Sequence, residues 1–326
     1  MVSMQDIADR VGISKATVSL VLNGKAGSRV SAATQKKVLE AAAELDYHIN
    51  NVARSLRMGQ SPFVGIVVTD ISNEFFGKLT FHIQEEAKKH GFMVITVNTN
   101  ESSSEFDDIV SMLISNQVAG IIAVPTNDSL ATLSRIRMLG IPLVQIDRTV
   151  EGIDADYVGV DNYVGIRNAM KKLLAKGKRR CAMVSFDLDV NPIIDRQKGF
   201  KDALAEAGVL DPSLIKIIHY ENQETGISEA IEELAAAHPD LVFFSSRRAF
   251  TQSMAYLSTH HRRVPEATLL CFDNVESYRA VAPDIWFIDQ PVKEMAEKSF
   301  QLLLERIKGR RETETAIFSP VCNSPE

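Results

Sequence analysis

The sequence has few cysteines and no long apolar run. Its three cysteines, Cys181, Cys271 and Cys322, are odd in number and far apart, which argues against a disulfide framework and a Cys-x-x-Cys metal site. No apolar run approaches the ~18 residues of a membrane helix, and no apolar signal segment follows Met1. We therefore expect buried reduced thiols, no metal, no membrane segment and a place in the cytoplasm.

The motifs of several large enzyme classes are also missing. The sequence contains no Gly-x-Gly-x-x-Gly after a first strand, no Gly-x4-Gly-Lys-Ser/Thr loop, no Gly-x-Ser-x-Gly elbow and no His-Glu-x-x-His. Its many Asp and Glu residues could serve acid–base chemistry, but no pattern selects a pair. The sequence therefore favours a protein that is not an enzyme and that needs no cofactor.

The charge is unevenly distributed along the chain. The 326 residues are 45% hydrophobic and 24% charged, which is typical of globular proteins with two or three domains. The net charge is −6, yet residues 1–60 carry eight Lys/Arg against five Asp/Glu, and the remainder carries 28 against 37. Because DNA phosphates repel an acidic body, any DNA contact should fall to the basic head.

The head shows the pattern of a helix-turn-helix. Apolar residues recur at helical spacing over residues 4–11 and 16–22. Between them, Gly12 can end the first helix in the left-handed conformation, and Ser14 can cap the second. A third stripe, with Ser31 as its cap, can close a small three-helix core. An ordinary amphipathic helical hairpin would show much of the same pattern.

The residues of the head and of the segment behind it carry a family resemblance. The matching residues are Ile7-Ala8, Val11-Gly12-Ile13-Ser14, Thr17-Val18-Ser19, Val21-Leu22-Asn23-Gly24, Val30-Ser31, Thr34, Val38, Ala42, Leu45, Tyr47, Asn50 and Ala53-Arg54-Ser55-Leu56. This pattern closely resembles the DNA-binding region of the lactose/galactose-repressor (LacI/GalR) family of transcription regulators. The resemblance implies a helix-turn-helix domain at 1–48 and a hinge segment at 49–60.

The resemblance also implies which residues contact DNA. Lys15, Ala16 and Leu20 match positions that select bases, whereas Thr17, Ser19 and Asn23 match phosphate contacts. In the hinge, the implied contacts are Asn50, Ala53 and Leu56, with Leu56 as a wedge in the minor groove. Without the surrounding pattern, simple helix packing would explain Leu56 as well. The family usually has Pro where this chain has Ile49, so we expect a less fixed entry to the hinge.

From residue 61 onward, short apolar runs alternate with longer amphipathic stretches. We expect strands at 64–69, 92–97, 119–124, 142–146, 181–185, 214–219, 240–244, 268–272 and 285–288, with helices at 74–90, 104–116 and 128–139. Repeated strand–helix units favour an α/β fold with two doubly wound parallel sheets. This matches the periplasmic-binding-protein-like core of the same family. We expect an N-subdomain at about 61–160 and 291–318, and a C-subdomain at about 161–290 and 319–326.

Ligands of such folds bind at the carboxyl ends of the strands, in the crevice between the subdomains. We expect the effector-binding residues at strand ends: Asp70, Phe75, Phe76, Asp147, Arg196, Glu221, Ser246, Arg247, Asp273 and Gln290. Carboxylates, an arginine and aromatic faces are the groups that bind a sugar. Arg196 and Asp273 fit the family's effector contacts best. For any single residue, a helix cap or a solvated charge is the competing explanation.

Arg247 stands where the family commonly has a carboxylate. A gained cation favours a sugar phosphate over a neutral sugar. However, Arg247 and Arg248 could equally be surface charges at the start of a helix.

The sequence thus predicts a homodimeric transcription factor, most simply a repressor. It would bind a near-palindromic operator and a sugar or sugar phosphate. A co-repressor or a phosphocarrier protein could replace the inducer. The rival functions are a transporter's solute-binding protein, which would lack the basic head, and a sugar-acting enzyme on the same scaffold.

Overall fold

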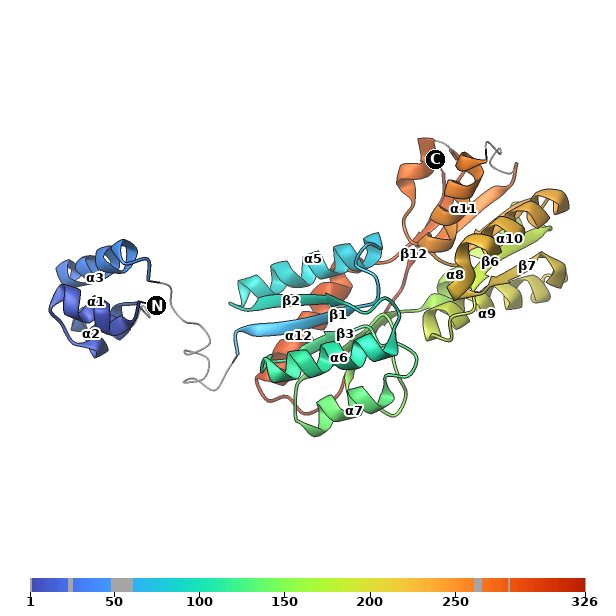
Figure 1. The fold of residues 1–326 in the computed structure, drawn as a ribbon. Helices are drawn as coiled ribbons and strands as arrows, with labels where there is room; N and C mark the ends of the chain where they lie inside the picture. Colours follow the sequence, from blue (N-terminus) through green and yellow to red (C-terminus); the bar gives the residue numbers. More distant parts are fainter. Residues whose placement is uncertain (1, 23–25, 48–60, 261–265, 281, 326) are drawn as a thin grey trace. The chain divides into compact units, whose positions relative to one another are not determined.

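The computed structural model describes residues 2–22, 26–47, 61–260, 266–280 and 282–325 (Figure 1). The chain forms two compact units, Met1–Pro62 and Phe63–Glu326, which we call the head and the core. The predicted hinge and four of the predicted DNA contacts lie outside the described residues: Asn23, Asn50, Ala53 and Leu56.

Among its described residues, the head contains three α-helices, α1 (Met4–Val11), α2 (Lys15–Leu22) and α3 (Ala32–Glu44), with a short 3-10 turn, η1 (Gly27–Arg29). Gly12 has a φ of 71° and its amide donates to the carbonyl of Ala8, so the predicted left-handed end of α1 is confirmed. Ser14 accepts a hydrogen bond from the amide of Thr17 and Ser31 from that of Thr34, which confirms both predicted caps. The turn between α1 and α2 is thus set by local backbone preferences.

The core of the head is small and continuous. Ile7, Val18 and Val38 are fully buried and come one from each helix. Val21, Ala41 and other small apolar residues complete the cluster. The helical spacing of the apolar residues thus produces a three-helix unit, as the sequence predicts.

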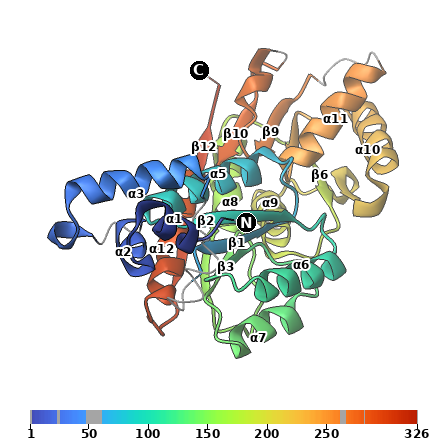
Figure 2. The same ribbon diagram turned by 60° about the vertical axis from the view of Figure 1, so that its left-hand side comes forward.

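The first sheet of the core has six strands in the order β11-β5-β4-β3-β1-β2. Its strands are β1 (Phe63–Val68), β2 (Met93–Asn98), β3 (Ile121–Ala123), β4 (Leu143–Ile146), β5 (Asp156–Val160) and β11 (Thr315–Phe318). α5 (Glu74–Lys89) and α12 (Val292–Ile307) pack on one face, and α6 (Ser103–Ser115) and α7 (Leu130–Met138) on the other (Figure 2). We call this sheet and its helices the first lobe.

The second sheet repeats this order as β12-β10-β9-β8-β6-β7. Its strands are β6 (Cys181–Phe186), β7 (Ile215–Ile218), β8 (Leu241–Phe244), β9 (Thr268–Phe272), β10 (Trp286–Asp289) and β12 (Val321–Asn323). α10 (Gln223–Ala237) and α11 (Arg247–Thr259) cover one face, and α8 (Asn162–Ala175) and α9 (Asn191–Glu206) the other. We call this sheet and its helices the second lobe.

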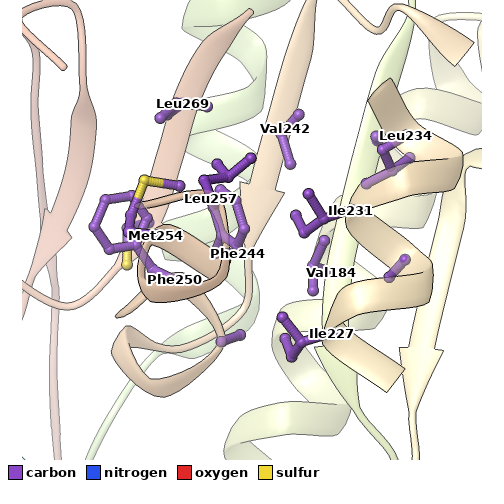
Figure 3. Close-up of a cluster of buried hydrophobic side chains, with 14 of the residues drawn as sticks. Val184, Ile227, Ile231, Leu234, Val242, Phe244, Phe250, Met254, Leu257 and Leu269 are labelled. Carbon is purple, nitrogen blue, oxygen red and sulfur yellow. The ribbon is translucent and has the colours of Figure 1, made fainter. Parts of the chain in front are cut away.

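Most apolar runs of the sequence become strands buried on both faces, whereas the edge strands β2 and β7 stay partly exposed. Figure 3 shows one such layer, where Val184, Val242 and Phe244 of the sheet meet α10 and α11. Ile227, Ile231 and Leu234 lie one helical turn apart on α10, so they share the face that points to the sheet. The predicted doubly wound α/β architecture is confirmed.

Three strands were not predicted from the sequence. β5, β11 and β12 are short, and β5 begins with a charged residue, Asp156. β12 also pairs antiparallel with β10, in a sheet otherwise paired in parallel. Periodicity does not reveal such segments because pairing with a neighbouring strand, rather than their own composition, makes them strands.

The chain crosses between the lobes three times. The crossings lie between β5 and α8, between β10 and α12, and between β11 and β12. The first and third crossings are adjacent, since the amide of Asp161 donates to the carbonyl of Phe318. The base of β11 is fixed by Asp156, which is fully buried, pairs with Arg306 Nε at 2.7 Å and accepts from the amide of Glu314.

No helix within the described ranges has both the length and the apolar character needed to cross a membrane.

Candidate functional site

A cavity lies between the two lobes of the core, with side chains of both lobes along its walls. Polar residues reach it from the carboxyl ends of β1, β4, β8, β9 and β10. Eight of the ten predicted effector residues line it: Asp70, Phe75, Phe76, Asp147, Arg196, Ser246, Asp273 and Gln290. We call this cavity the cleft.

Two aspartates occupy equivalent places in the two lobes. Asp147 directly follows β4 and Asp273 directly follows β9, and the two strands hold the same position in their sheets. Both residues have left-handed backbones, with φ of 64° and 81°. Each amide donates to the next strand, Asp147 to the carbonyl of Val158 and Asp273 to that of Ile288, both at 2.9 Å. Such strained backbone at a cleft is typical of functional positions.

The two carboxylates differ in their surroundings. Gln290 Nε2 donates to Asp273 Oδ1 at 2.6 Å, and the amide of Arg247 donates to Asp273 Oδ2 at 3.4 Å. Burial raises the pKa of Asp147 to about 6, although the charges of Arg148 and Arg196 oppose the shift. Asp147 can therefore change its protonation state near neutral pH.

Arg196 lies at the floor of the cleft on α9. It is 5% exposed, donates from Nε to Asn162 Oδ1 at 2.8 Å and from Nη1 to the carbonyl of Ser245 at 3.0 Å. Its guanidinium stands 3.5 Å from the centre of the Phe272 ring. These contacts fix the plane of the guanidinium, so it can present its remaining donors in one orientation.

A buried acceptor faces this part of the core. Gln290 is 6% exposed, and its Oε1 atom has no hydrogen-bond partner in the part of the chain that the structure describes. An unpartnered buried carbonyl is costly, so a ligand hydroxyl or a water molecule there would be stabilising. Phe75 and Phe76, which pack edge to face at 5.0 Å, supply apolar surface on the opposite lobe.

A second arginine of the cleft, Arg148, forms an ion pair within the first lobe. Arg148 makes a two-point contact with Glu101, at 2.6 Å to Oε2 and 2.7 Å to Oε1. Both residues line the cleft. This geometry is the strongest that an arginine and a carboxylate can adopt, so it holds the charge of Arg148 in place.

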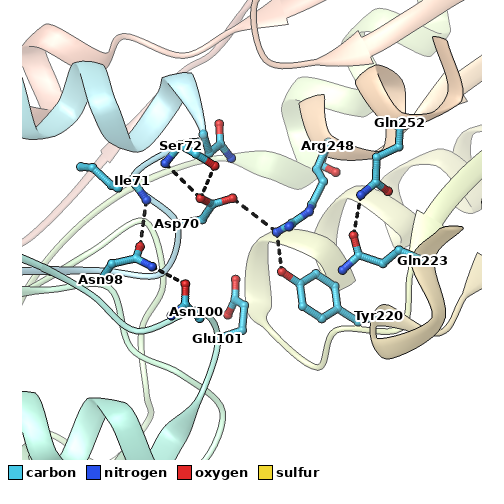
Figure 4. A network of polar contacts seen from close by, with 12 residues as sticks. Asp70, Ile71, Ser72, Asn98, Asn100, Glu101, Tyr220, Gln223, Arg248 and Gln252 are labelled. Carbon is cyan, nitrogen blue, oxygen red and sulfur yellow. Dashed lines mark hydrogen bonds and ion pairs between the residues drawn. The ribbon is translucent and has the colours of Figure 1, made fainter. Parts of the chain in front are cut away.

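Figure 4 shows a third arginine, Arg248, between Asp70 of the first lobe and Tyr220 of the second. Its Nη1 atom lies 3.3 Å from Asp70 Oδ2 and donates to the Tyr220 hydroxyl at 2.6 Å. The neighbouring Arg247 pairs with Glu74 of the first lobe at 2.5 Å and donates to the carbonyl of Asn274. Both arginines do lie at the start of a helix, α11, but both contact the facing lobe.

Two predicted residues lie elsewhere. Glu221 is exposed on a short 3-10 turn, η3 (Tyr220–Asn222), and its neighbour Tyr220 lines the cleft instead. Arg247 lines a smaller adjoining cavity that shares Asp273 and Gln290 with the cleft. Arg148 and Tyr220 also line the cleft, and both stand at strand ends, where the sequence places the site. Glu101 and Arg248 line it too, and no strand-end pattern in the sequence selects them.

Within the described ranges, no group of three or more His, Cys, Asp or Glu side chains is placed to hold a metal ion.

The predicted DNA-contact residues that the structure describes lie on one helix of the head, α2. Lys15 and Ala16 are exposed at the N-terminal end of α2, and Thr17, Ser19 and Leu20 are half-buried along it. Val18 and Val21 of the same helix are buried in the core of the head. The helix therefore presents a small, polar N-terminal end away from the core, as a major-groove helix does.

Comparison with known proteins decides the family. The profile "Bacterial regulatory proteins, lacI family" matches residues 3–50, and "Periplasmic binding protein domain" matches residues 64–311. The ribose operon repressor of Bacillus subtilis (strain 168) is 31% identical over 327 residues, covering 98% of this chain and 96% of that protein. The chain belongs to the lacI family of bacterial regulatory proteins.

Solved structures of this family share the fold. A periplasmic binding protein/LacI transcriptional regulator from Alkaliphilus metalliredigens QYMF, complexed with D-xylulofuranose, is 26% identical with a TM-score of 0.69, covering 82% of this chain and 98% of that one. The lac repressor dimer bound to operator and the anti-inducer ONPF has a TM-score of 0.84 at 20% identity, with 99% and 98% coverage. This lacI-family chain therefore combines a helix-turn-helix head with an effector-binding core.

Proposed function

We propose that the protein is a homodimeric transcription repressor that binds a near-palindromic operator and is regulated by a neutral sugar in the cleft. The observation that carries this proposal is the combination, in one chain, of the lacI-family head and a cleft with converging carboxylates. The head argues against a transporter's solute-binding protein. A repressor acts on chromosomal DNA, so we propose the cytoplasm as its location.

The cleft has the groups that recognise a polyol. Asp147 and Asp273 can each accept hydrogen bonds from ligand hydroxyls, and Arg196 can donate. Phe75 and Phe76 can cover the C–H face of a sugar ring. Relatives support this class of ligand, since one is a ribose operon repressor and another is complexed with D-xylulofuranose.

The charges of the cleft favour a neutral sugar over a sugar phosphate. Four carboxylates and three guanidiniums line it, and Arg148 and Arg248 are each paired with a carboxylate. Arg247, the reason for expecting an anionic ligand, is paired with Glu74. A phosphate entering the cleft would have to displace one of these carboxylates or lie beside Asp147 and Asp273.

Regulation would act through the relative position of the lobes. A ligand that contacts both lobes binds one arrangement more tightly and so shifts the equilibrium towards it. In the dimer, such a shift would change the spacing of the two hinge segments and thereby operator affinity. A coupling of about 1–3 kcal/mol, or ~5–150-fold in affinity, would suffice.

Two substitutions separate the two activities. Arg196→Ala should weaken sugar binding at least tenfold while leaving operator binding in the absence of sugar nearly unchanged. Leu56→Ala should do the reverse, because the resemblance implies a minor-groove contact for Leu56. Fluorescence polarisation with an operator selected from random duplexes measures operator binding, and calorimetry measures sugar binding. Equal losses in both assays for both variants would contradict this division.

A thermal-shift panel identifies the ligand class. Pentoses, hexoses and disaccharides are compared with their phosphate esters, with and without operator DNA. We expect stabilisation by a neutral sugar and little by its ester. Stabilisation by the ester alone, lost in Arg247→Ala, would support an anionic effector instead. Because we propose no enzymatic activity, chemical turnover of the bound sugar by the purified protein would overturn that part of the proposal.

A further inference from the structure

α11 begins with two arginines that both reach the opposite lobe. Arg248 lies 3.3 Å from Asp70, and Arg247 lies 2.5 Å from Glu74. Asp70 follows β1, and Glu74 begins α5, so both partners stand at one end of the first lobe. Two neighbouring residues of the second lobe are thus paired with two neighbouring acids of the first (Figure 4 shows the Asp70 pair).

Each acidic partner is held in position by its own lobe. Asp70 Oδ1 accepts from the amide of Ser72 at 3.0 Å and from its hydroxyl at 2.5 Å, while Oδ2 faces Arg248. Glu74 Oε1 pairs with Lys78 at 2.6 Å, while Oε2 faces Arg247. Lys78 and Arg247 lower the pKa of Glu74, so it stays ionised. The carboxylates are therefore preorganised, and little ordering is required when the lobes meet.

Arg247 and Arg248 are also held in position by contacts within the second lobe. Arg248 donates to the Tyr220 hydroxyl and its guanidinium lies 5.3 Å from the centre of that ring. Arg247 donates to the carbonyl of Asn274. Both pairs bridge the rim of the cleft, since Asp70 and Arg248 line the cleft itself and Glu74 and Arg247 line the adjoining cavity.

We propose that Arg247 and Arg248 form an ionic clasp, with Glu74 and Asp70, that holds the two lobes closed on the cleft when no ligand is bound. They act as positioning residues rather than as ligand contacts. That an effector binds in the cleft rests on the proposed function. For an effector that binds the closed form, the clasp raises the affinity of the protein by the same factor by which it increases the fraction of closed molecules.

The stabilisation of the closed form by the clasp should be small and sensitive to salt. The side chains of Arg248 and Glu74 are 38% and 42% exposed, so water and ions reach both pairs. Partly exposed pairs contribute little individually, and together they should change the ratio of closed to open forms by roughly 3- to 20-fold. Because salt screens exposed charges, the open fraction should rise with ionic strength.

Small-angle X-ray scattering of the full-length, ligand-free protein tests the clasp. We expect the pair-distance distribution to broaden and the radius of gyration to increase between 50 mM and 1 M NaCl. In the double variant Arg247→Gln/Arg248→Gln, the profile at 50 mM should already match the wild-type profile at 1 M. The double variant Arg247→Lys/Arg248→Lys keeps the charges and should remain closed at 50 mM and open with salt.

A matched control removes an ion pair inside one lobe. Arg137 pairs with Asp154 at 2.8 Å within the first lobe, so Arg137→Gln should scatter like the wild type at both salt concentrations. A wild-type profile that is independent of salt, or a glutamine double variant that stays closed, would overturn the clasp. Operator and sugar binding are not used in this test, so its failure would leave the proposed function standing.

Discussion

At Asp147, the fold buries a carboxyl group that is ordinarily ionised and exposed to water. The position directly after β4 turns the chain in a left-handed conformation and buries the carboxyl group, leaving it 7% exposed. Burial raises its pKa to about 6 from an ordinary value of 3.8. The folded protein therefore binds a proton there more tightly than the unfolded chain does, and that stabilisation is lost as the pH rises through 6.

Replacing Asp147 with Asn should remove this pH dependence. The wild type should lose about 2 kcal/mol of unfolding free energy relative to Asp147→Asn between pH 4 and pH 7, because each pKa unit corresponds to ~1.4 kcal/mol and part of the change falls below pH 4. Urea denaturation of both proteins at half-unit pH steps measures the difference. A difference between the two proteins that is constant with pH would contradict the assignment.

The role of a single residue is predictable from the sequence where local chemistry decides it and less so where distant contacts decide it. Gly12 and Ser14 were assigned correctly because a helix end and a cap depend on adjacent backbone. The places of Asp147 and Asp273 at the carboxyl edges of their two sheets are predictable because each directly follows a buried strand. The partner of Arg248 could not be predicted, since Asp70 lies 178 residues away and no local pattern joins them.

At the scale of elements, the packing of α8 against α9 depends on a close approach of backbones. A Cβ atom at Gly199 of α9 would lie 2.8 Å from the carbonyl oxygen of Tyr163 and 3.4 Å from Ile166 Cβ, both on α8. The two helices must therefore separate if any side chain is added there. This constraint acts on the layer that supports Arg196, which is on the same helix as Gly199.

Gly199→Ala should destabilise the protein by ~1–3 kcal/mol through overpacking. Its matched control is Gly77→Ala on α5, where the nearest atom to a new Cβ is the carbonyl oxygen of Ile71 at 3.6 Å, an ordinary contact. That control should be neutral or stabilising by up to ~1 kcal/mol, because alanine favours helix more than glycine does. Thermal unfolding of the three proteins measures both effects, and a neutral Gly199→Ala would show that the helices separate at little cost.

The short strands mark where element prediction from sequence fails. β5 has a weak signal in the sequence because its first residue, Asp156, is charged, and that charge is balanced by two distant arginines, Arg306 of α12 and Arg310. β12 was missed because three residues carry too little periodicity. The longer apolar runs were found within one or two residues at most ends, since burial on both faces leaves a continuous signal.

At the scale of the whole molecule, the separation of charge assigns DNA contact to the head. The first 60 residues have eight basic and five acidic side chains, whereas the remainder has an acidic excess. Binding to an operator should therefore release counterions only along the head. Operator affinity should fall linearly with salt on logarithmic axes, with a slope close to the number of phosphates neutralised.

Lys15→Gln should reduce that slope by about one, since one cation at the DNA surface is lost. Lys171→Gln is the matched control because Lys171 is exposed on α8 of the core, and it should leave the slope unchanged. Fluorescence polarisation of a labelled operator between 50 and 300 mM KCl gives the slopes. Equal slopes for Lys15→Gln and the wild type would place Lys15 away from the duplex.

Because the chain crosses between the lobes three times, the gene cannot be divided into one segment for each lobe. Neither lobe corresponds to one uninterrupted coding stretch, because α12 and β11 of the first lobe follow the strands β6 to β10 of the second. A protease that cleaves one connection would leave the halves tethered by two others. Recombination with a relative could transfer the DNA specificity of the head by a single exchange, whereas transferring one lobe alone requires several breakpoints.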